Sequence, residues 1–310
     1  METWTTRANH LVDPSLHVWS WQIPLYLFLG GLVAGMMVLA GASCWRGRPM
    51  RGGVAQRFPL LALLAITLGM IALFLDLEHK LYVLRLYLTI EPASPMSWGA
   101  WILLLVYPIL FALLALTPPA GLAARAPWIA RIGHWIAQEP VRLRGLGALA
   151  IAVGIGLGLY TGVLLSSLGA RPFWSNGLLA PLFLVSGLSS GAALGHLLSE
   201  LPEERKQLIK VDSLLLLAEL ALLVLFVISL ASAGTASRTA AGLLLGGPLT
   251  AVFWVLVFAI GIAFPLTIQS LSIAGRIGHA PLAPVLVLLG GLALRVLVVL
   301  AGQLSHWKPV

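Results

Sequence analysis

Two ionisable side chains at the end of an apolar run of this sequence have the types and spacing needed for proton transfer. Asp76 and His79 are three residues apart, which places two side chains on one face of a helix. A histidine changes its charge near neutral pH, and a neighbouring carboxylate can exchange a proton with it. We therefore interpret Asp76 and His79, together with Tyr160 of a later apolar segment, as candidate catalytic residues.

Other polar and aromatic residues are expected at the same depth as this pair. The candidates for binding a common molecule are His17, Trp21, Gln22, Tyr26, Trp98 and Tyr160. A quinone suits this set, because its head group needs hydrogen-bond donors and proton-exchanging groups, while its ring and tail need aromatic and apolar walls. The alternative is that the aromatic residues form an interfacial belt, and that Asp76 and His79 are a polar helix end.

A second group of polar residues is expected deeper in the apolar segments. Its members are Asp212, Glu219, Arg295, Ser186, Ser190 and His196. An ion pair between Glu219 and Arg295 would reduce the cost of placing both charges away from water. The functional alternative is a proton path along these side chains, with His196 at its mouth.

The composition shows which elements must position these residues. Of 310 residues, 59% are apolar and 10% are charged, and the mean hydropathy is +0.98, which excludes a soluble globular domain. A membrane-crossing helix needs about 20 apolar residues. The apolar runs predict eight spans, at residues 20–44, 57–79, 98–118, 145–168, 178–199, 211–233, 249–273 and 281–304. We expect an all-α integral membrane protein.

The basic residues indicate how these spans are oriented. The loops after spans 1, 3, 5 and 7 carry 12 Lys and Arg residues, whereas the other loops and the termini carry 6. Cytoplasmic loops are enriched in Lys and Arg, so both termini are expected outside the cytoplasm. The net charge of +8 is then a mark of topology and not of nucleic-acid binding. Loop 80–97 becomes the expected docking surface for an extracytoplasmic partner, and residues 125–140 are predicted to form an amphipathic helix in the membrane interface.

Small residues recur every four positions in two of the spans. Gly154, Gly158 and Gly162 form one stripe, and Gly187, Gly191 and Gly195 form another. Such stripes let neighbouring helix backbones approach closely, so we interpret them as packing surfaces.

The cysteine and histidine residues limit the redox groups that the chain itself could hold. Cys44 is the only cysteine, which excludes an iron–sulfur cluster bound by this chain alone. The seven histidines provide no opposed pair at one depth, so we expect no haem. The first apolar run is long and has no basic region before it, and it is expected to remain in the mature protein.

Several blocks of the sequence resemble the NrfD/PsrC family, the polysulfide-reductase-type membrane subunits. They are residues 19–31, Ser94-Pro95-Met96-Ser97-Trp98-Gly99, residues 160–166, residues 183–193, Leu294-Arg295 and Ala301-Gly302-Gln303. These blocks follow one another in the family's order and cover nearly the whole chain.

The resemblance implies an architecture of two four-helix bundles, here residues 1–168 with the quinone site and residues 169–310 with the possible proton path. It implies a menaquinone or ubiquinone site near the extracytoplasmic face, with Tyr160 at the head group and Trp21, Gln22 and Tyr26 as the other wall. It also associates Glu219 and Arg295 with proton movement.

The resemblance further implies a place in a respiratory oxidoreductase complex of a prokaryotic cytoplasmic membrane. The expected partners are a four-cluster ferredoxin-like iron–sulfur subunit and a molybdopterin catalytic subunit, with the terminal substrate handled on the partner chain. The competing interpretation is a secondary transporter or a passive anchor, in which Glu219 and Arg295 line a mid-membrane site.

Overall fold

The computed structural model describes residues 19–47, 53–278 and 280–307, and the elements within these ranges are helical. Within these ranges, eight helices are long and apolar enough to cross a membrane. They are α1 (Gln22–Trp45), α2 (Phe58–Asp76), α4 (Pro95–Leu116), α7 (Pro140–Ser166), α8 (Leu179–Leu198), α9 (Pro202–Ser232), η3 with α11 (Val252–Ala263 and Phe264–Ile273) and α12 (Leu282–Leu304). The prediction of eight spans is confirmed.

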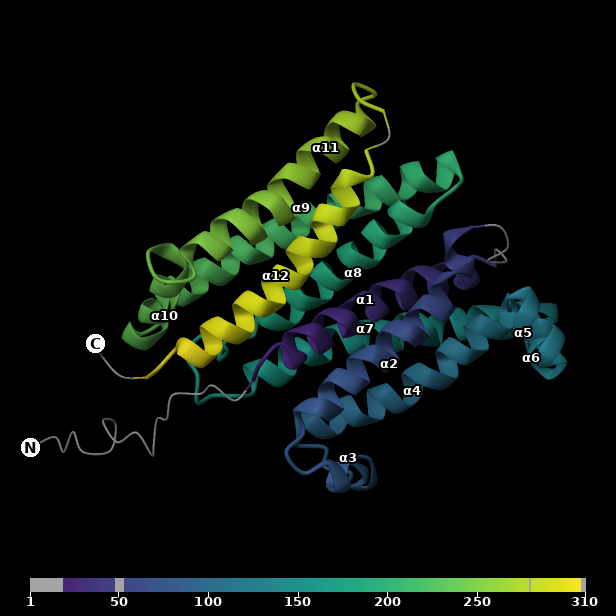
Figure 1. Cartoon of the computed structure of the whole chain (residues 1–310), viewed down its shortest axis with the longest axis horizontal. Helices are drawn as coiled ribbons and strands as arrows, with labels where there is room; N and C mark the ends of the chain where they lie inside the picture. The colour runs from purple at the N-terminus through teal and green to yellow at the C-terminus, as the bar shows by residue number, and fades with distance from the viewer. Residues whose placement is uncertain (1–18, 48–52, 279, 308–310) are drawn as a thin grey trace, which may run out of the picture.

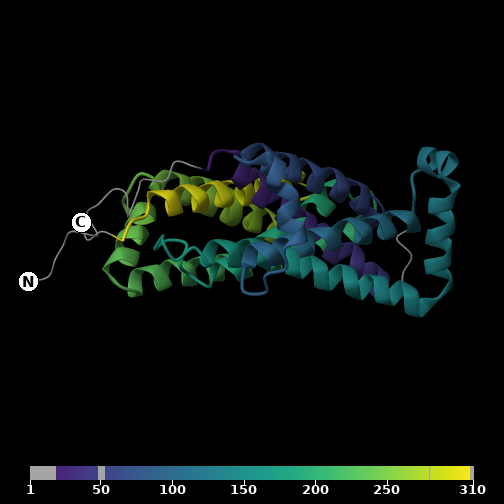
Figure 2. The same ribbon diagram turned by 90° about the horizontal axis from the view of Figure 1, so that it is seen from below.

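Short helices connect these spans. They are η1 (Val54–Gln56), η2 (Lys80–Tyr82), α3 (Val83–Leu88), α5 (Ala120–Arg125), α6 (Pro127–Gln138) and α10 (Thr235–Leu245). The amphipathic helix expected at residues 125–140 is present as α6, and Figure 2 shows it running across the direction of the long helices at one end of the molecule.

Prolines explain why several helices begin earlier than the apolar pattern predicts. Helices α4, α7 and α9 start at Pro95, Pro140 and Pro202, whereas the predicted spans start at 98, 145 and 211. Proline is favoured in the first turn because the amide it lacks would have no intrahelical partner there. Hydropathy marks only the part of a helix that suits lipid, so it misses the polar turns that extend beyond.

Helix α1 lies at the centre of the arrangement. It packs against α2, α7, α8 and α12, and Figure 1 shows α2 and α4 on one side of it and α9, α11 and α12 on the other. Buried residues of α1 contribute to two apolar cores, one shared with α2, α4 and α7 and one shared mainly with α8, α9, η3 and α12. The division into two bundles at residue 168 remains a prediction.

Glycines allow α1 and α8 to pack backbone against backbone. A Cβ atom on Gly191 would lie 2.7 Å from the Cα of Gly35, and a Cβ atom on Gly35 would overlap the backbone of Gly187. No larger residue fits at these positions without moving a helix. The interpretation of this stripe as a packing surface is confirmed.

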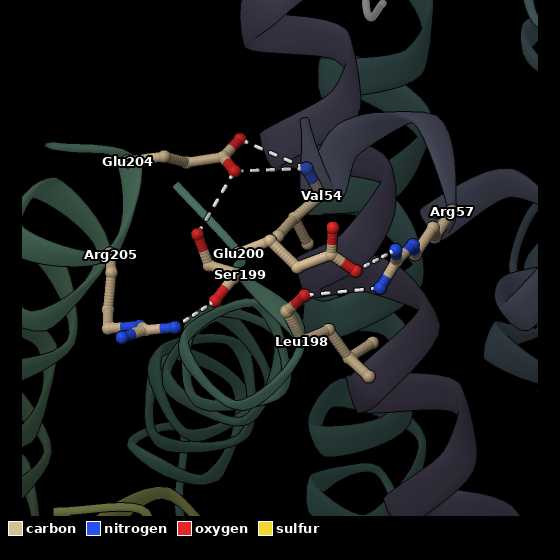
Figure 3. Close-up of polar contacts among 7 residues, drawn as sticks. All are labelled: Val54, Arg57, Leu198, Ser199, Glu200, Glu204 and Arg205. Carbon is tan, nitrogen blue, oxygen red and sulfur yellow. Dashed lines mark hydrogen bonds and ion pairs between the residues drawn. The ribbon is translucent and has the colours of Figure 1, made fainter. Parts of the chain in front are cut away.

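Polar contacts join the two ends of this helix pair to other parts of the chain. At the N-terminal end of α1, the Gln303 amide donates to the Trp19 carbonyl (3.0 Å) and accepts from the Trp19 amide (3.1 Å). At the opposite end, the Glu204 carboxylate accepts from the Val54 amide (3.1 Å) and from the Ser199 hydroxyl (3.1 Å), as Figure 3 shows. The α1–α2 connection is thereby tied to the α8–α9 turn.

Candidate functional site

A cavity of about 420 Å³ opens at the N-terminal end of α1, beside the connection between α2 and α4. Its walls come from α1, α2, α4, α7 and the segment between α2 and α4. The lining residues are Trp19, Ile23, Tyr26, Leu27, Leu73, Asp76, Leu77, His79, Tyr82, Val83, Tyr87, Met96, Ala100, Leu103, Tyr160, Leu164 and Leu165. The cavity is therefore mostly apolar, with phenols, one carboxyl and one imidazole as its polar groups.

Tyr160 of α7 is buried in this wall and is positioned by a glycine of α4. A Cβ atom on Gly99 would overlap the Tyr160 ring and hydroxyl, so the phenol occupies the space where a side chain would otherwise be. Tyr160 is 7% exposed. The ring is thus held by backbone on one side, which limits its movement relative to the cavity.

Tyr26 of α1 places a second phenol near the first. It is 3% exposed, and its hydroxyl has the Tyr160 hydroxyl as its hydrogen-bonding neighbour. Two hydroxyls that share one hydrogen bond use one proton between them, so the other proton is available to a bound molecule.

Asp76 and His79 both line the cavity, but not for the reason expected from their spacing. The prediction that they share a helical face is wrong, because α2 ends at Asp76 and the chain continues in extended conformation at Leu77. His79 then lies in the connecting segment, where its ring packs edge-on against Tyr82, with ring centroids 6.1 Å apart. Asp76 is partly buried and His79 is exposed, which places them at the cavity mouth.

Two tyrosines that were not predicted also line the cavity. Tyr82 and Tyr87 come from η2 and α3, and the Arg85 guanidinium lies over the Tyr82 ring at 4.6 Å. Burial raises the pKa of Tyr87, with a further contribution from Tyr107, so its phenol stays protonated at neutral pH. Aromatic residues five positions apart in loop 80–97 were the available signal, but the helical turns that bring both of them to the cavity cannot be predicted from spacing.

Three of the predicted binding residues lie away from this cavity. Trp21 is 59% exposed and lines a separate groove of about 600 Å³ between α1 and α12. Trp98 is 47% exposed, and its indole donates to the Pro92 carbonyl at 2.7 Å. Gln22 does not line the cavity, and its side-chain oxygen is buried without a partner among the described residues. His17 lies outside the described residues.

A second polar cluster surrounds Asp212 between α8, α9 and α11. The fully buried carboxylate accepts hydrogen bonds from Ser189 (2.6 Å) and from the Gln269 amide (2.5 Å). Ser213 donates to the Gln269 oxygen at 2.7 Å. Gln269 was not predicted, although an amide within a long apolar run was a visible signal.

A third contact set joins Arg295 of α12 to α8 and α9. The guanidinium donates to the Ser186 hydroxyl, to the Phe183 carbonyl (3.0 Å) and to the Gly291 carbonyl (3.2 Å). Glu219 interacts with Ser186 and with Arg295, and all three side chains are buried. Ser186 is therefore a shared neighbour of the carboxylate and the guanidinium, for which an ion pair was expected.

The remaining predicted residues of this group lie on α8. The Ser190 hydroxyl donates to the Ser186 carbonyl at 2.8 Å, so it is engaged with its own helix. His196 is 2% exposed near the end of α8. Among the described residues, no group of three or more His, Cys, Asp and Glu side chains is arranged to hold a metal ion.

The sequence matches known proteins over nearly its whole length. The family profile described as "Polysulphide reductase, NrfD" matches residues 9–306. The C chain of the polysulfide reductase of Wolinella succinogenes is 31% identical over 310 aligned residues, which cover 92% of the present sequence and 94% of the relative. Protein NrfD of Escherichia coli is 31% identical over 307 residues, covering 93% and 96%.

Proposed function

This chain belongs to the NrfD family of polysulfide-reductase-type membrane subunits, and we propose that it exchanges electrons between a membrane quinone and an iron–sulfur partner subunit. The observation that carries the proposal is the cavity beside α1, where two buried phenols, one carboxyl and one imidazole meet within apolar walls. Menaquinone and ubiquinone both belong to the chemical class that such a site suits.

The residues of the cavity fit a quinone head group in size and in donor chemistry. Its volume of about 420 Å³ lies within the range of roughly 300 to 1,000 Å³ that is usual for small-molecule sites. The Tyr26 and Tyr160 hydroxyls are hydrogen-bonding neighbours, and the proton that is not used between them could be donated to a carbonyl oxygen of the head group. Bound in this cavity, a quinone would supply two-electron, two-proton redox chemistry.

The side chains divide into those that hold the head group and those that move protons. Tyr160 and Tyr26 donate hydrogen bonds from the buried end. Asp76 and His79, at the cavity mouth, exchange protons with water, because a carboxyl and an imidazole can each act as a general acid or base. Apolar side chains of α1, α2 and α4 exclude water from the rest of the ring.

Loop 80–97 supports a docking surface beside this site. Leu84, Leu88 and Ile90 are 66%, 80% and 68% exposed, and they lie next to the cavity-lining residues Tyr82 and Tyr87. Exposed apolar groups at one place mark interaction surfaces. We assign this loop to the iron–sulfur partner on the extracytoplasmic side, with a molybdopterin subunit beyond it.

Tyr160→Phe in the assembled complex tests the quinone site. The ring is kept and the hydrogen-bond donor is lost, so quinone-linked turnover should fall by about 10- to 100-fold while assembly persists. Tyr107→Phe is the matched control, because Tyr107 lies on α4 outside the cavity, where its hydroxyl contacts the Thr67 hydroxyl at 3.4 Å. Equal turnover in the two variants would refute the role of Tyr160.

The buried groups on α8, α9 and α12 support a proton path as a second part of the proposal. Asp212, Ser189, Ser186 and Glu219 are buried polar groups on facing helices, an arrangement that could pass protons along hydrogen bonds. Glu219→Gln should change proton uptake by membrane vesicles without changing the apparent affinity for quinone. Unchanged proton uptake would make Glu219 a packing partner of Arg295.

A further inference from the structure

Helices α5 and α6 form a segment that lies across the end of the membrane-spanning helices (Figure 2). Helix α6 packs on α4 through Gly133 and Ile136, the two residues of α6 that are buried. A Cβ atom on Gly133 would overlap the Ala115 carbonyl. The close approach holds α6 firmly against the end of α4, so its other faces have a defined direction.

One of these faces is apolar and exposed. Trp128, Ile132 and Trp135 are 60%, 43% and 57% exposed, and their spacing of four and three residues places them along one line of the helix. Tryptophan is enriched where hydrocarbon meets head groups, and an amphipathic helix in that layer buries such a stripe to a depth of about 5 to 10 Å. This face therefore suits the boundary of a lipid bilayer.

The charges around this stripe have one dominant sign. Arg125, Arg131, Arg142 and Arg144 are exposed, and Glu139 is the only acidic residue between positions 117 and 147. None of the four arginines forms an ion pair with a carboxylate in the part of the chain that the structure describes. Their positive charge is left for an external anion.

The aromatic stripe and the basic group are joined directly. The Arg142 guanidinium lies 4.1 Å from the centre of the Trp135 ring, and its Nη1 donates to the Trp135 carbonyl at 3.1 Å. Arg142 is thus held beside the apolar stripe. A different arrangement occurs nearby at the α8–α9 turn, where Arg57 pairs with Glu200 (Figure 3).

We propose that this surface, formed by Trp128, Ile132, Trp135, Arg131 and Arg142, binds the head group of an anionic phospholipid. The guanidinium groups contact the phosphate and its glycerol substituent, since arginine matches phosphate oxygens in geometry and charge. The indole rings lie at the level of the upper acyl chain. The bound lipid holds the C-terminal end of α4 and the N-terminal end of α7 at one leaflet of the membrane.

The test uses the purified full-length chain in neutral detergent, titrated with dioleoylphosphatidylglycerol or dioleoylphosphatidylcholine. Bound lipid is counted by native mass spectrometry. The unsubstituted chain should prefer the anionic lipid, and R131Q/R142Q should lose affinity for it by on the order of 25-fold, since each basic residue at a lipid surface contributes roughly fivefold. Affinity for the zwitterionic lipid should stay the same.

Arg276→Gln is the matched control, because Arg276 is an exposed arginine at the same end of the molecule, between α11 and α12. Should the double variant fail to fold, Arg131→Gln alone provides the test, since the Arg131 side chain makes no hydrogen bond within the described part of the chain. A preference for the anionic lipid that survives the variants, or falls equally in Arg276→Gln, would overturn the proposal. The proposal would also be overturned if the variants lost a co-purifying protein while their lipid preference stayed unchanged.

Discussion

Gly99 of α4 and Tyr160 of α7 are in such close contact that no side-chain carbon fits between them. Because Gly99 has no side chain, the Tyr160 phenol can occupy the space beside it. This relationship connects helix packing to the chemistry of the cavity, because any group added at Gly99 must displace the Tyr160 ring.

Gly99→Ala should therefore impair the proposed quinone site without removing any of its functional groups. A displacement of about 1 Å at a reacting group can lower turnover on the order of 100-fold. Quinone-linked turnover of the assembled complex is the measurement. Gly156→Ala is the control, because its Cβ would meet only Ile102, at an ordinary distance of 3.8 Å. Similar turnover in both variants would contradict the positioning role.

Gln269→Leu should destabilise the chain by about 1 to 3 kcal/mol, because it leaves the buried carboxylate of Asp212 and the hydroxyl of Ser213 each short of one partner. Thermal unfolding in detergent measures the change. In the double variant with Asp212→Asn the cost should be less than the sum of the single costs, since the two side chains share one network. Strict additivity would show that the two residues act independently.

At the α8–α9 turn, Glu204→Ala should destabilise the chain more than Glu200→Ala does. Glu204 satisfies the Val54 amide and the Ser199 hydroxyl (Figure 3), and loss of such hydrogen bonds costs about 1 to 3 kcal/mol. The Glu200 pair with Arg57 is solvent-exposed and contributes about 0 to 1 kcal/mol. The unfolding midpoints of the two variants measure the difference. A lower midpoint for Glu200→Ala than for Glu204→Ala would contradict this explanation.

Leu88→Glu should weaken assembly with the proposed iron–sulfur partner, because it places a charge on the 80%-exposed apolar residue of loop 80–97. The measurement is the amount of partner subunits recovered when the complex is purified by way of the variant chain. A loss of about tenfold is expected for an interface residue whose change costs more than about 1 kcal/mol. Arg238→Glu on α10 is a surface control. Full recovery with Leu88→Glu would place the docking surface elsewhere.

The composition and periodicity of the sequence were sufficient to predict the architecture at the level of elements. Eight apolar runs become eight helices because a chain in lipid must satisfy its backbone hydrogen bonds within each segment. The glycine stripe of α8 could be interpreted from sequence because small residues at this spacing allow close helix packing, and Gly187 and Gly191 do lie against α1. The family membership also follows from the order of short blocks along the chain.

Which residues share a cavity was decided only by the tertiary structure. Trp21 and Tyr26 are close in sequence, yet one faces the groove beside α12 and the other faces Tyr160, because successive residues of a helix point in different directions. Asp76 and His79 meet at the cavity through a chain bend after α2 and not through helical spacing. The positions of Tyr87 and Gln269 likewise depend on the connections between helices and on helix packing. Local pattern determines where a helix can form, whereas the direction of each side chain relative to other helices depends on contacts between segments far apart in the sequence.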